Sequence, residues 1–192
     1  MKKEQIKEQI TDHFKLNEQI LSLSDKIEKL AKKAVQVLKK NGTIFWCGNG
    51  GSASDSQHLA AELVGRFEND RSPLKSIALN TDTSLITAIS NDYSYDLIFK
   101  RQLETLGNDK DLLIAISTSG NSKNIINVLL EAKRKQLFSA ALLGKDGGNA
   151  KEIADLSIIV PSQSTARIQE MHILIGHLLC SYIEKKMFEN LK

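Results

Sequence analysis

Apolar residues recur in two different patterns along the chain, and the change between them divides the sequence. In the first forty residues the spacing is helical, with one row at Ile6, Ile10 and Phe14 and a second from Ile27 to Leu38. Residues three or four apart fall on one face of a helix. Asn41-Gly42 then supplies a helix-stop signal. We therefore predict two helices before position 41.

Beyond position 42 the apolar residues gather in five short runs, Thr43–Cys47, Ser76–Asn80, Asp111–Ser117, Ser139–Gly144 and Leu156–Pro161. Most of these runs are separated by segments of helical spacing, and a final long helix is predicted from about Thr165 to the tail. This alternation indicates an α/β fold, a three-layer sandwich with a five-stranded parallel sheet covered on both faces. We expect residues 1–192 to form one domain, with 1–40 as a helical oligomerisation segment.

Composition narrows the class of protein. The chain has 192 residues, of which 41% are hydrophobic and 26% charged, which suits one domain with a sizeable core. No apolar run approaches the roughly 20 residues that span a bilayer, and Met1–Gln5 leads into polar residues, so we expect a cytosolic protein without a membrane partner. The net charge of +3 is spread without a long basic block, which argues against nucleic-acid binding. Cys47 and Cys180 lack metal-ligand spacing and are interpreted as buried thiols.

The first apolar run leads into a glycine-rich loop, Gly48-Asn49-Gly50-Gly51-Ser52, at the predicted start of a helix. Such a loop presents free backbone N–H groups to an anion. His58 and Glu62 follow on the same helix, four residues apart, so their side chains lie only about 40° apart around it. This pair suits a metal site or an acid–base pair. A dinucleotide site is not expected, because no carboxylate ends the next strand to hold a ribose.

A second loop, Ser117-Thr118-Ser119-Gly120-Asn121-Ser122, follows the third run and opens a helix at Lys123. Hydroxyl groups and backbone N–H groups converge there, beside the positive end of a helix dipole. Parallel sheets bind ligands beyond the carboxyl ends of their strands. We therefore predict that this loop holds the phosphate of a substrate, although an isolated loop of this composition would equally suit an ordinary serine-rich turn.

The C-terminal helix carries Gln169, His172 and His177. With Ile168 taken as zero on a helical wheel, His172 lies at about 40°, at the edge of the apolar stripe, whereas Gln169 and His177 lie at about 100° and about 180°. We interpret His172 as a packed, hydrogen-bonded histidine. The position of His177 alone favours neither a functional nor a structural role. It becomes a site candidate in partnership with Gln169 and the His58/Glu62 pair.

Taken together, the two loops and the segment Arg167–Ile173 resemble the sugar isomerase (SIS) fold and, within it, the phosphoheptose isomerase family. The resemblance covers roughly Asn41 to the C-terminus. It implies an aldose–ketose isomerase that converts sedoheptulose 7-phosphate into D-glycero-D-manno-heptose 7-phosphate for the ADP-heptose of lipopolysaccharide. It also implies homotetramers with sites between subunits.

Carried over by motif, the resemblance implies one zinc ion per subunit bound by His58, Glu62, Gln169 and His177. It implies substrate contacts from Asn49, Gly50, Gly51, Ser52, Glu62, Asn91, Asp92, Ser117, Thr118, Ser119, Ser122 and Gln169. A non-enzymatic relative with the same fold, a tetramer that binds the DNA-replication initiator, shares several short sequence motifs with this chain. That relative replaces the residues that correspond to Glu62 and His177, and both are intact here.

Isomerisation moves a carbonyl group between two neighbouring carbons, which requires one base and one acid. We assign Glu62 as the base and His177 as the partner that moves protons, and zinc as a Lewis acid without a redox role. The two roles of Glu62 compete, since a zinc-bound carboxylate is a weaker base. Glutamine is also an unusual zinc ligand. Zinc binding is therefore predicted separately from the catalytic roles of Glu62 and His177.

Overall fold

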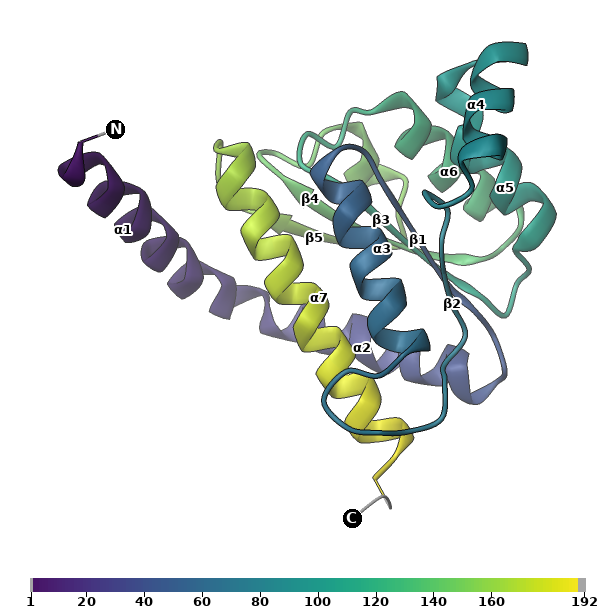
Figure 1. Cartoon of the computed structure of the whole chain (residues 1–192), viewed down its shortest axis with the longest axis horizontal. Coiled ribbons are helices and arrows are strands. Elements are labelled where there is room, and N and C mark those ends of the chain that lie inside the picture. Colours follow the sequence, from purple (N-terminus) through teal and green to yellow (C-terminus); the bar gives the residue numbers. More distant parts are fainter. Residues whose placement is uncertain (1, 190–192) are drawn as a thin grey trace.

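The computed structural model describes residues 2–189 and alternates strands with helices after two N-terminal helices (Figure 1). The helices are α1 (Lys3–Ile20), α2 (Ser24–Lys39), α3 (Gly51–Val64), α4 (Thr83–Asp92), α5 (Ile98–Leu106), α6 (Lys123–Arg134) and α7 (Thr165–Met187). The strands are β1 (Ile44–Gly48), β2 (Ser76–Ala78), β3 (Leu112–Ser117), β4 (Phe138–Gly144) and β5 (Leu156–Val160). Each predicted apolar run forms a strand within a few residues of its predicted bounds.

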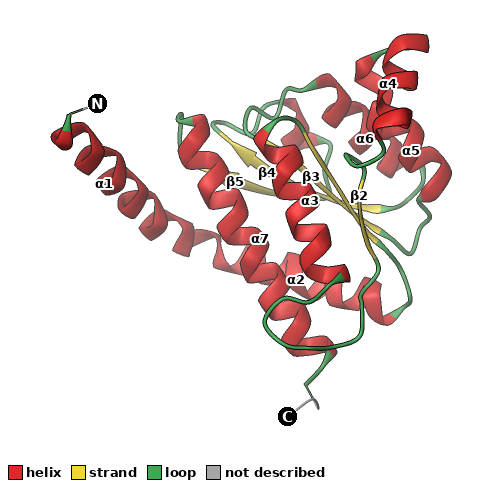
Figure 2. Ribbon diagram, viewed as in Figure 1, coloured by secondary structure: helices red, strands yellow, loops and turns green. Residues whose placement is uncertain are grey.

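All five strands pair in parallel, in the order β2-β1-β3-β4-β5. Their side chains alternate between two buried faces. Trp46 and Ile114 belong to a core with α2, α3 and α7, whereas Phe45 and Leu113 belong to a core with α5 and α6. Figure 2 shows these helices on opposite sides of the sheet. The predicted three-layer α/β sandwich is therefore confirmed.

Strands β1 and β3 are neighbours whose chains leave the sheet toward opposite faces. Gly48 is paired with Ile116 at the carboxyl ends of these strands. After β1 the chain enters α3 on one face, and after β3 it enters α6 on the other. In sheets of this kind, ligands usually bind outside the carboxyl ends of the strands at such a point of divergence. Both loops predicted to bind the substrate start there.

The N-terminal helices form as predicted; α1 bonds to α7 through Gln9 and His13, but its N-terminal end projects beyond the rest of the chain (Figure 1). Its apolar row is exposed, with Ile10 at 51% and Phe14 at 65% of their full accessibility. By contrast, the row from Ile27 to Leu38 on α2 packs into the core. Between residues 2 and 189, no helix combines the length and the apolar character that a membrane span requires.

Candidate active site

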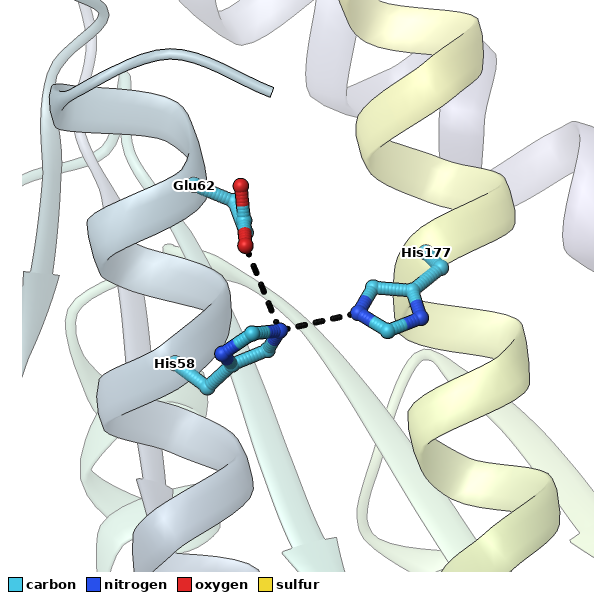
Figure 3. Close-up of side chains that lie close together, drawn as sticks. All are labelled: His58, Glu62 and His177. Carbon is cyan, nitrogen blue, oxygen red and sulfur yellow. Dashed lines mark hydrogen bonds and ion pairs between the residues drawn. The ribbon is translucent and has the colours of Figure 1, made fainter. Parts of the chain in front are cut away.

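Helices α3 and α7 lie side by side on one face of the sheet and bring His58, Glu62 and His177 together (Figure 3). The helices can approach closely because residue 176 is glycine. A Cβ atom at that position would lie 2.5 Å from the methyl groups of Leu59, which is fully buried on α3. This close approach places His177, the next residue on α7, beside His58.

The three side chains form a compact cluster. The Nε2 atom of His58 lies 2.9 Å from Nε2 of His177 and 3.3 Å from Oε1 of Glu62. One ligand atom from each residue can be chosen so that all three lie within 4.8 Å of one another. The predicted i, i+4 pair on α3 thus does project side by side, and the structure completes it with His177 from the same chain. We call this group the histidine–glutamate cluster.

The donor set of the cluster fits a zinc ion. Two imidazole nitrogens and a carboxylate oxygen are ligands that catalytic zinc sites use, with a further position left for substrate or water. The two Nε2 atoms already point toward one another, so a shared partner would replace their mutual hydrogen bond. Zinc binding stays a prediction that the geometry of His58, Glu62 and His177 accommodates.

Gln169 lies about two helical turns before His177 on α7, beside the glycine-rich loop. A Cβ atom on Gly51 would lie 2.4 Å from its amide nitrogen, so only glycine leaves room for this side chain. Its Nε2 donates a hydrogen bond of 3.3 Å to Oδ1 of Asp55. Gln169 therefore connects α7 to the first turns of α3, and its role as a metal ligand remains a prediction.

Asp55 is a site residue that our sequence analysis missed. It is only 7% exposed, and its Oδ2 atom has no hydrogen-bond partner among the described residues. Burial raises the pKa of Asp55, although the hydrogen bond from Gln169 and the nearby His58 act in the opposite direction. A buried, unsatisfied carboxylate oxygen can accept a bond from water or from a substrate hydroxyl. The signal was present, since Asp55, His58 and Glu62 follow the i, i+3, i+7 spacing of one helix face.

The glycine-rich loop is anchored by hydrogen bonds to residues on the other face of the sheet. The side chains of Asn49 and Asn124 exchange two hydrogen bonds of 2.9 and 2.8 Å, and the Tyr95 hydroxyl donates to Oδ1 of Asn49. Gly50 adopts a φ of 56°, a left-handed conformation that favours glycine. Ser52 is buried and its N–H donates to the Asn49 carbonyl oxygen at 3.0 Å, so its contact with substrate stays a prediction from the resemblance.

The serine-rich loop is a folded turn at the end of β3. The Ser117 hydroxyl accepts a hydrogen bond from the Gly120 N–H, and the Ser119 hydroxyl accepts one from the Asn121 N–H. Each hydroxyl keeps its own proton free to donate. Ser122 occupies the position just before α6. The predicted helix start at Lys123 is confirmed, and phosphate binding by this loop stays a prediction.

Two histidines five residues apart on α7 have different environments, as the helical wheel predicted. His172 is fully buried, and its Nε2 pairs with the Leu143 carbonyl oxygen at 2.9 Å. Burial lowers the pKa of His172 to about 4, so it is neutral at physiological pH. His177 instead belongs to the histidine–glutamate cluster. Cys47 and Cys180 are buried free thiols, as expected.

Asn91 and Asp92, for which the resemblance implies substrate contacts, are the last two residues of α4. The two exposed side chains bond to each other, Nδ2 of Asn91 donating to Oδ1 of Asp92 at 2.8 Å. Within residues 2–189, neither side chain hydrogen-bonds to the two substrate loops. Their role in substrate binding therefore stays a prediction that this chain alone does not assemble.

Comparison with known proteins places this chain in a family. The SIS domain model matches residues 10–144. The chain is 52% identical to a phosphoheptose isomerase of Sulfurimonas denitrificans over 189 residues, 97% of each chain. It is 48% identical to that of Akkermansia muciniphila, over 93% of each chain. This chain belongs to the phosphoheptose isomerase family.

Solved structures of the family share the fold over almost the whole chain. The phosphoheptose isomerase from Neisseria gonorrhoeae superimposes with a TM-score of 0.90 at 39% identity, covering 95% of this chain and 98% of that one. The corresponding structure from Francisella tularensis gives a TM-score of 0.92 at 36% identity, covering 95% and 97%. Family membership therefore extends over the helices and both loops that build the site.

Proposed function

We propose that this chain is a phosphoheptose isomerase, which interconverts sedoheptulose 7-phosphate and D-glycero-D-manno-heptose 7-phosphate in the synthesis of the heptose of lipopolysaccharide. The observation that carries the proposal is the convergence of Glu62 and His177 with His58 in a chain of this family. A carboxylate beside an imidazole supplies the base and the proton-moving partner that an aldose–ketose isomerisation requires.

In the proposed reaction Glu62 removes a proton from C1 of the ketose, and the electron pair of that bond forms an enediolate with C2 and its oxygen. Return of a proton to C2 gives the aldose. His177 moves protons between the two oxygens as the carbonyl group changes place. The same two residues serve in the reverse direction, so the net reaction neither gains nor loses a proton.

We propose that His58, Glu62 and His177 hold a zinc ion, with Gln169 as the fourth candidate ligand from the family resemblance. Zinc bound there would supply a Lewis acid that polarises the sugar oxygens and stabilises the developing negative charge. The buried position of Asp55 next to Gln169 suits a further contact with water or a substrate hydroxyl. The proton transfers described above require no change in the oxidation state of the zinc ion.

We propose that the two loops at the carboxyl ends of β1 and β3 anchor the substrate. We assign the phosphate to Thr118, Ser119 and Ser122, whose side chains are half-buried at the start of α6. Asn49 and the N–H groups of Gly50 and Gly51 would then contact the reacting end of the sugar. Fixing the remote phosphate converts its binding energy into orientation of the carbons near Glu62.

We propose a homotetramer, with 1–40 serving assembly. The exposed apolar row on α1 supports the proposal, and so does the exposed Leu178 on α7. Because Glu62 and His177 meet within one chain, mixing inactive Glu62→Gln subunits with inactive His177→Ala subunits should not restore activity beyond the sum of the two. Restoration would show that neighbouring subunits exchange these residues. Light scattering that shows an active monomer would contradict the oligomeric proposal.

The proposed function is tested by incubating the purified protein with sedoheptulose 7-phosphate and detecting the aldose through a coupled heptose kinase. Hexose and pentose phosphates serve as comparison substrates, and a chelator arm tests the metal. Conversion of the heptose phosphate supports the proposal. No specific observation favours the alternative of a non-enzymatic partner of the replication initiator, because the relatives reported above carry the name of an enzyme and the cluster is intact.

A further inference from the structure

A buried ion pair joins α7 to the segment that follows α3, beyond the histidine–glutamate cluster. The side chain of Arg71 is 0% exposed and that of Glu184 4% exposed, and Nε of Arg71 lies 3.0 Å from Oε2 of Glu184. Buried charges of this kind require nearly complete hydrogen bonding to be tolerated. The partners of these two residues therefore show what the pair holds in place.

Arg71 holds the end of the catalytic helix. Its Nη2 donates to the backbone carbonyl oxygen of Glu62 at 2.7 Å, and its Nη1 donates to that of Leu63 at 2.7 Å. These carbonyl groups belong to the last turn of α3, where no following helical N–H group can reach them. A guanidinium group also carries the charge that the C-terminal end of a helix favours. Arg71 thus binds the main chain of Glu62 itself.

Glu184 holds the connection after α3. Its carboxylate accepts backbone hydrogen bonds from Phe67, Glu68 and Asn69 at 3.2, 3.2 and 2.9 Å, and one of 2.8 Å from the Asn69 side chain. Burial alone would raise the pKa of Glu184, but the bonds from Asn69, Arg71 and Phe67 outweigh it and lower that pKa. The carboxylate therefore stays charged at the centre of a folded loop.

The loop returns to the cluster through Phe67. Its ring stacks on the imidazole of His177, with the ring centroids 5.8 Å apart and the planes 30° from parallel. Glu184 lies seven residues after His177 on α7, and therefore on the same helix face. The ion pair thus contacts both halves of the cluster, Glu62 through its backbone and His177 through Phe67.

We infer that Arg71 and Glu184 are positioning residues for the histidine–glutamate cluster: they fix the end of α3 against α7, and with it the spacing between Glu62 and His177. The inference rests on the proposed function only in treating that cluster as catalytic. Neither residue is among those assigned to the substrate. Their effect passes through the Glu62 main chain and the Phe67 ring.

The test compares Glu184→Gln with Glu131→Gln. Both replace a buried helical carboxylate that accepts bonds from an arginine, but Glu131 lies near the end of α6 and bonds to Arg134, away from the cluster. Arg71→Lys is the second site variant, because lysine keeps the charge but cannot donate in three fixed directions. Circular dichroism establishes that each variant is folded at the assay temperature.

The readouts are zinc affinity by competition with a chromophoric chelator, the NMR shift of the His177 ring protons, and the division of the activity loss between kcat and KM. We expect Glu184→Gln to weaken zinc binding about tenfold, the usual scale for residues that orient metal ligands. It should also shift the His177 resonances, which the Phe67 ring current influences, and lower kcat more than it raises KM. Glu131→Gln should change stability alone.

A folded Glu184→Gln variant with wild-type zinc affinity and unmoved His177 resonances would overturn the inference, and so would equal changes in Glu131→Gln. If Glu184→Gln does not fold, the same criteria apply to Arg71→Lys. A wild-type protein without isomerase activity would remove the proposed function. A His177 shift confined to the Arg71 and Glu184 variants would still support the positioning role.

Discussion

The histidine–glutamate cluster and the two substrate loops differ in where they lie and in how they are built: the loops follow the carboxyl ends of β1 and β3, whereas Glu62 lies in the last turn of α3. The cluster consists of side chains from α3 and α7, and its geometry depends on how closely two helices pack at Gly176. The loops consist largely of hydroxyl and backbone groups fixed at the ends of β1 and β3. Catalysis should therefore depend on a few side chains and on the distance between α3 and α7, whereas phosphate binding should be shared among several weaker hydrogen-bond donors.

The largest effect is expected at Glu62. Glu62→Gln preserves shape but removes the base, so kcat should fall at least about a hundredfold, the usual scale for general acid–base catalysis. Steady-state kinetics would measure this loss, with Glu104→Gln on α5 as a control for an exposed carboxylate remote from the cluster. Near-normal turnover by folded Glu62→Gln would remove Glu62 from the role of base.

Helix spacing should have the next largest effect. Gly176→Ala places a methyl group against Leu59 and forces α3 and α7 apart, which should destabilise the fold by about 1–3 kcal/mol, typical of an overpacked core. It should also lower kcat by disturbing the cluster. The double variant Gly176→Ala with Leu59→Ala relieves the overlap, so it should recover part of the kcat. Thermal unfolding and kinetics that show Gly176→Ala to be neutral would mean that the spacing is not critical.

A smaller effect, on KM, is expected at the serine-rich loop. Alanine at both Ser119 and Ser122 should raise KM for the sugar phosphate about tenfold and leave kcat nearly unchanged, since two hydrogen bonds with a net worth of about 0.7 kcal/mol each together contribute about 1.4 kcal/mol, which corresponds to a factor of ten. Inorganic phosphate should inhibit the wild type competitively and the variant less. Ser22→Ala with Ser24→Ala, in the connection between α1 and α2, is the matched control. Unaltered KM in the loop variant would place the phosphate elsewhere.

The smallest effect near neutral pH concerns His172. Because burial depresses its folded pKa to about 4 from the ordinary 6.5, the unfolded chain binds the extra proton first as pH falls. His172 should therefore cost no stability above about pH 6.5 and progressively lower the free energy of unfolding between about pH 6.5 and 4. Thermal unfolding of His172→Gln should show a shallower pH dependence in that window. An equal slope would show that His172 does not titrate there.

The cluster and the loops also differ in how much of each can be predicted from the sequence. The strands and loops follow from continuous apolar runs and from glycine and serine positions, which are local signals. The His58/Glu62 pair is local too, because it needs only the helical period. His177 required a family resemblance to be joined to that pair, since the spacing between α3 and α7 depends on packing that no local pattern encodes.

Other residues were beyond sequence reasoning for a physical reason. Arg71 and Phe67 act through a loop whose conformation depends on Glu184, more than a hundred positions away. Asn91 and Asp92 were assigned to the substrate only through the resemblance, because no local pattern connects the end of α4 with the two loops. The Ile6–Phe14 row was predicted correctly as helical, although the pattern alone could not show that α1 leaves it exposed.

The most direct test of the account is to follow sedoheptulose 7-phosphate by NMR in heavy water with the wild type and Glu62→Gln, each supplied with zinc. We predict that the wild type forms the aldose with solvent deuterium at C2 and exchanges a C1 hydrogen of the ketose, because both pass through the enediolate. Glu62→Gln should do neither at a comparable rate. A folded, zinc-supplied wild type that forms no aldose and exchanges no C1 hydrogen would contradict the account.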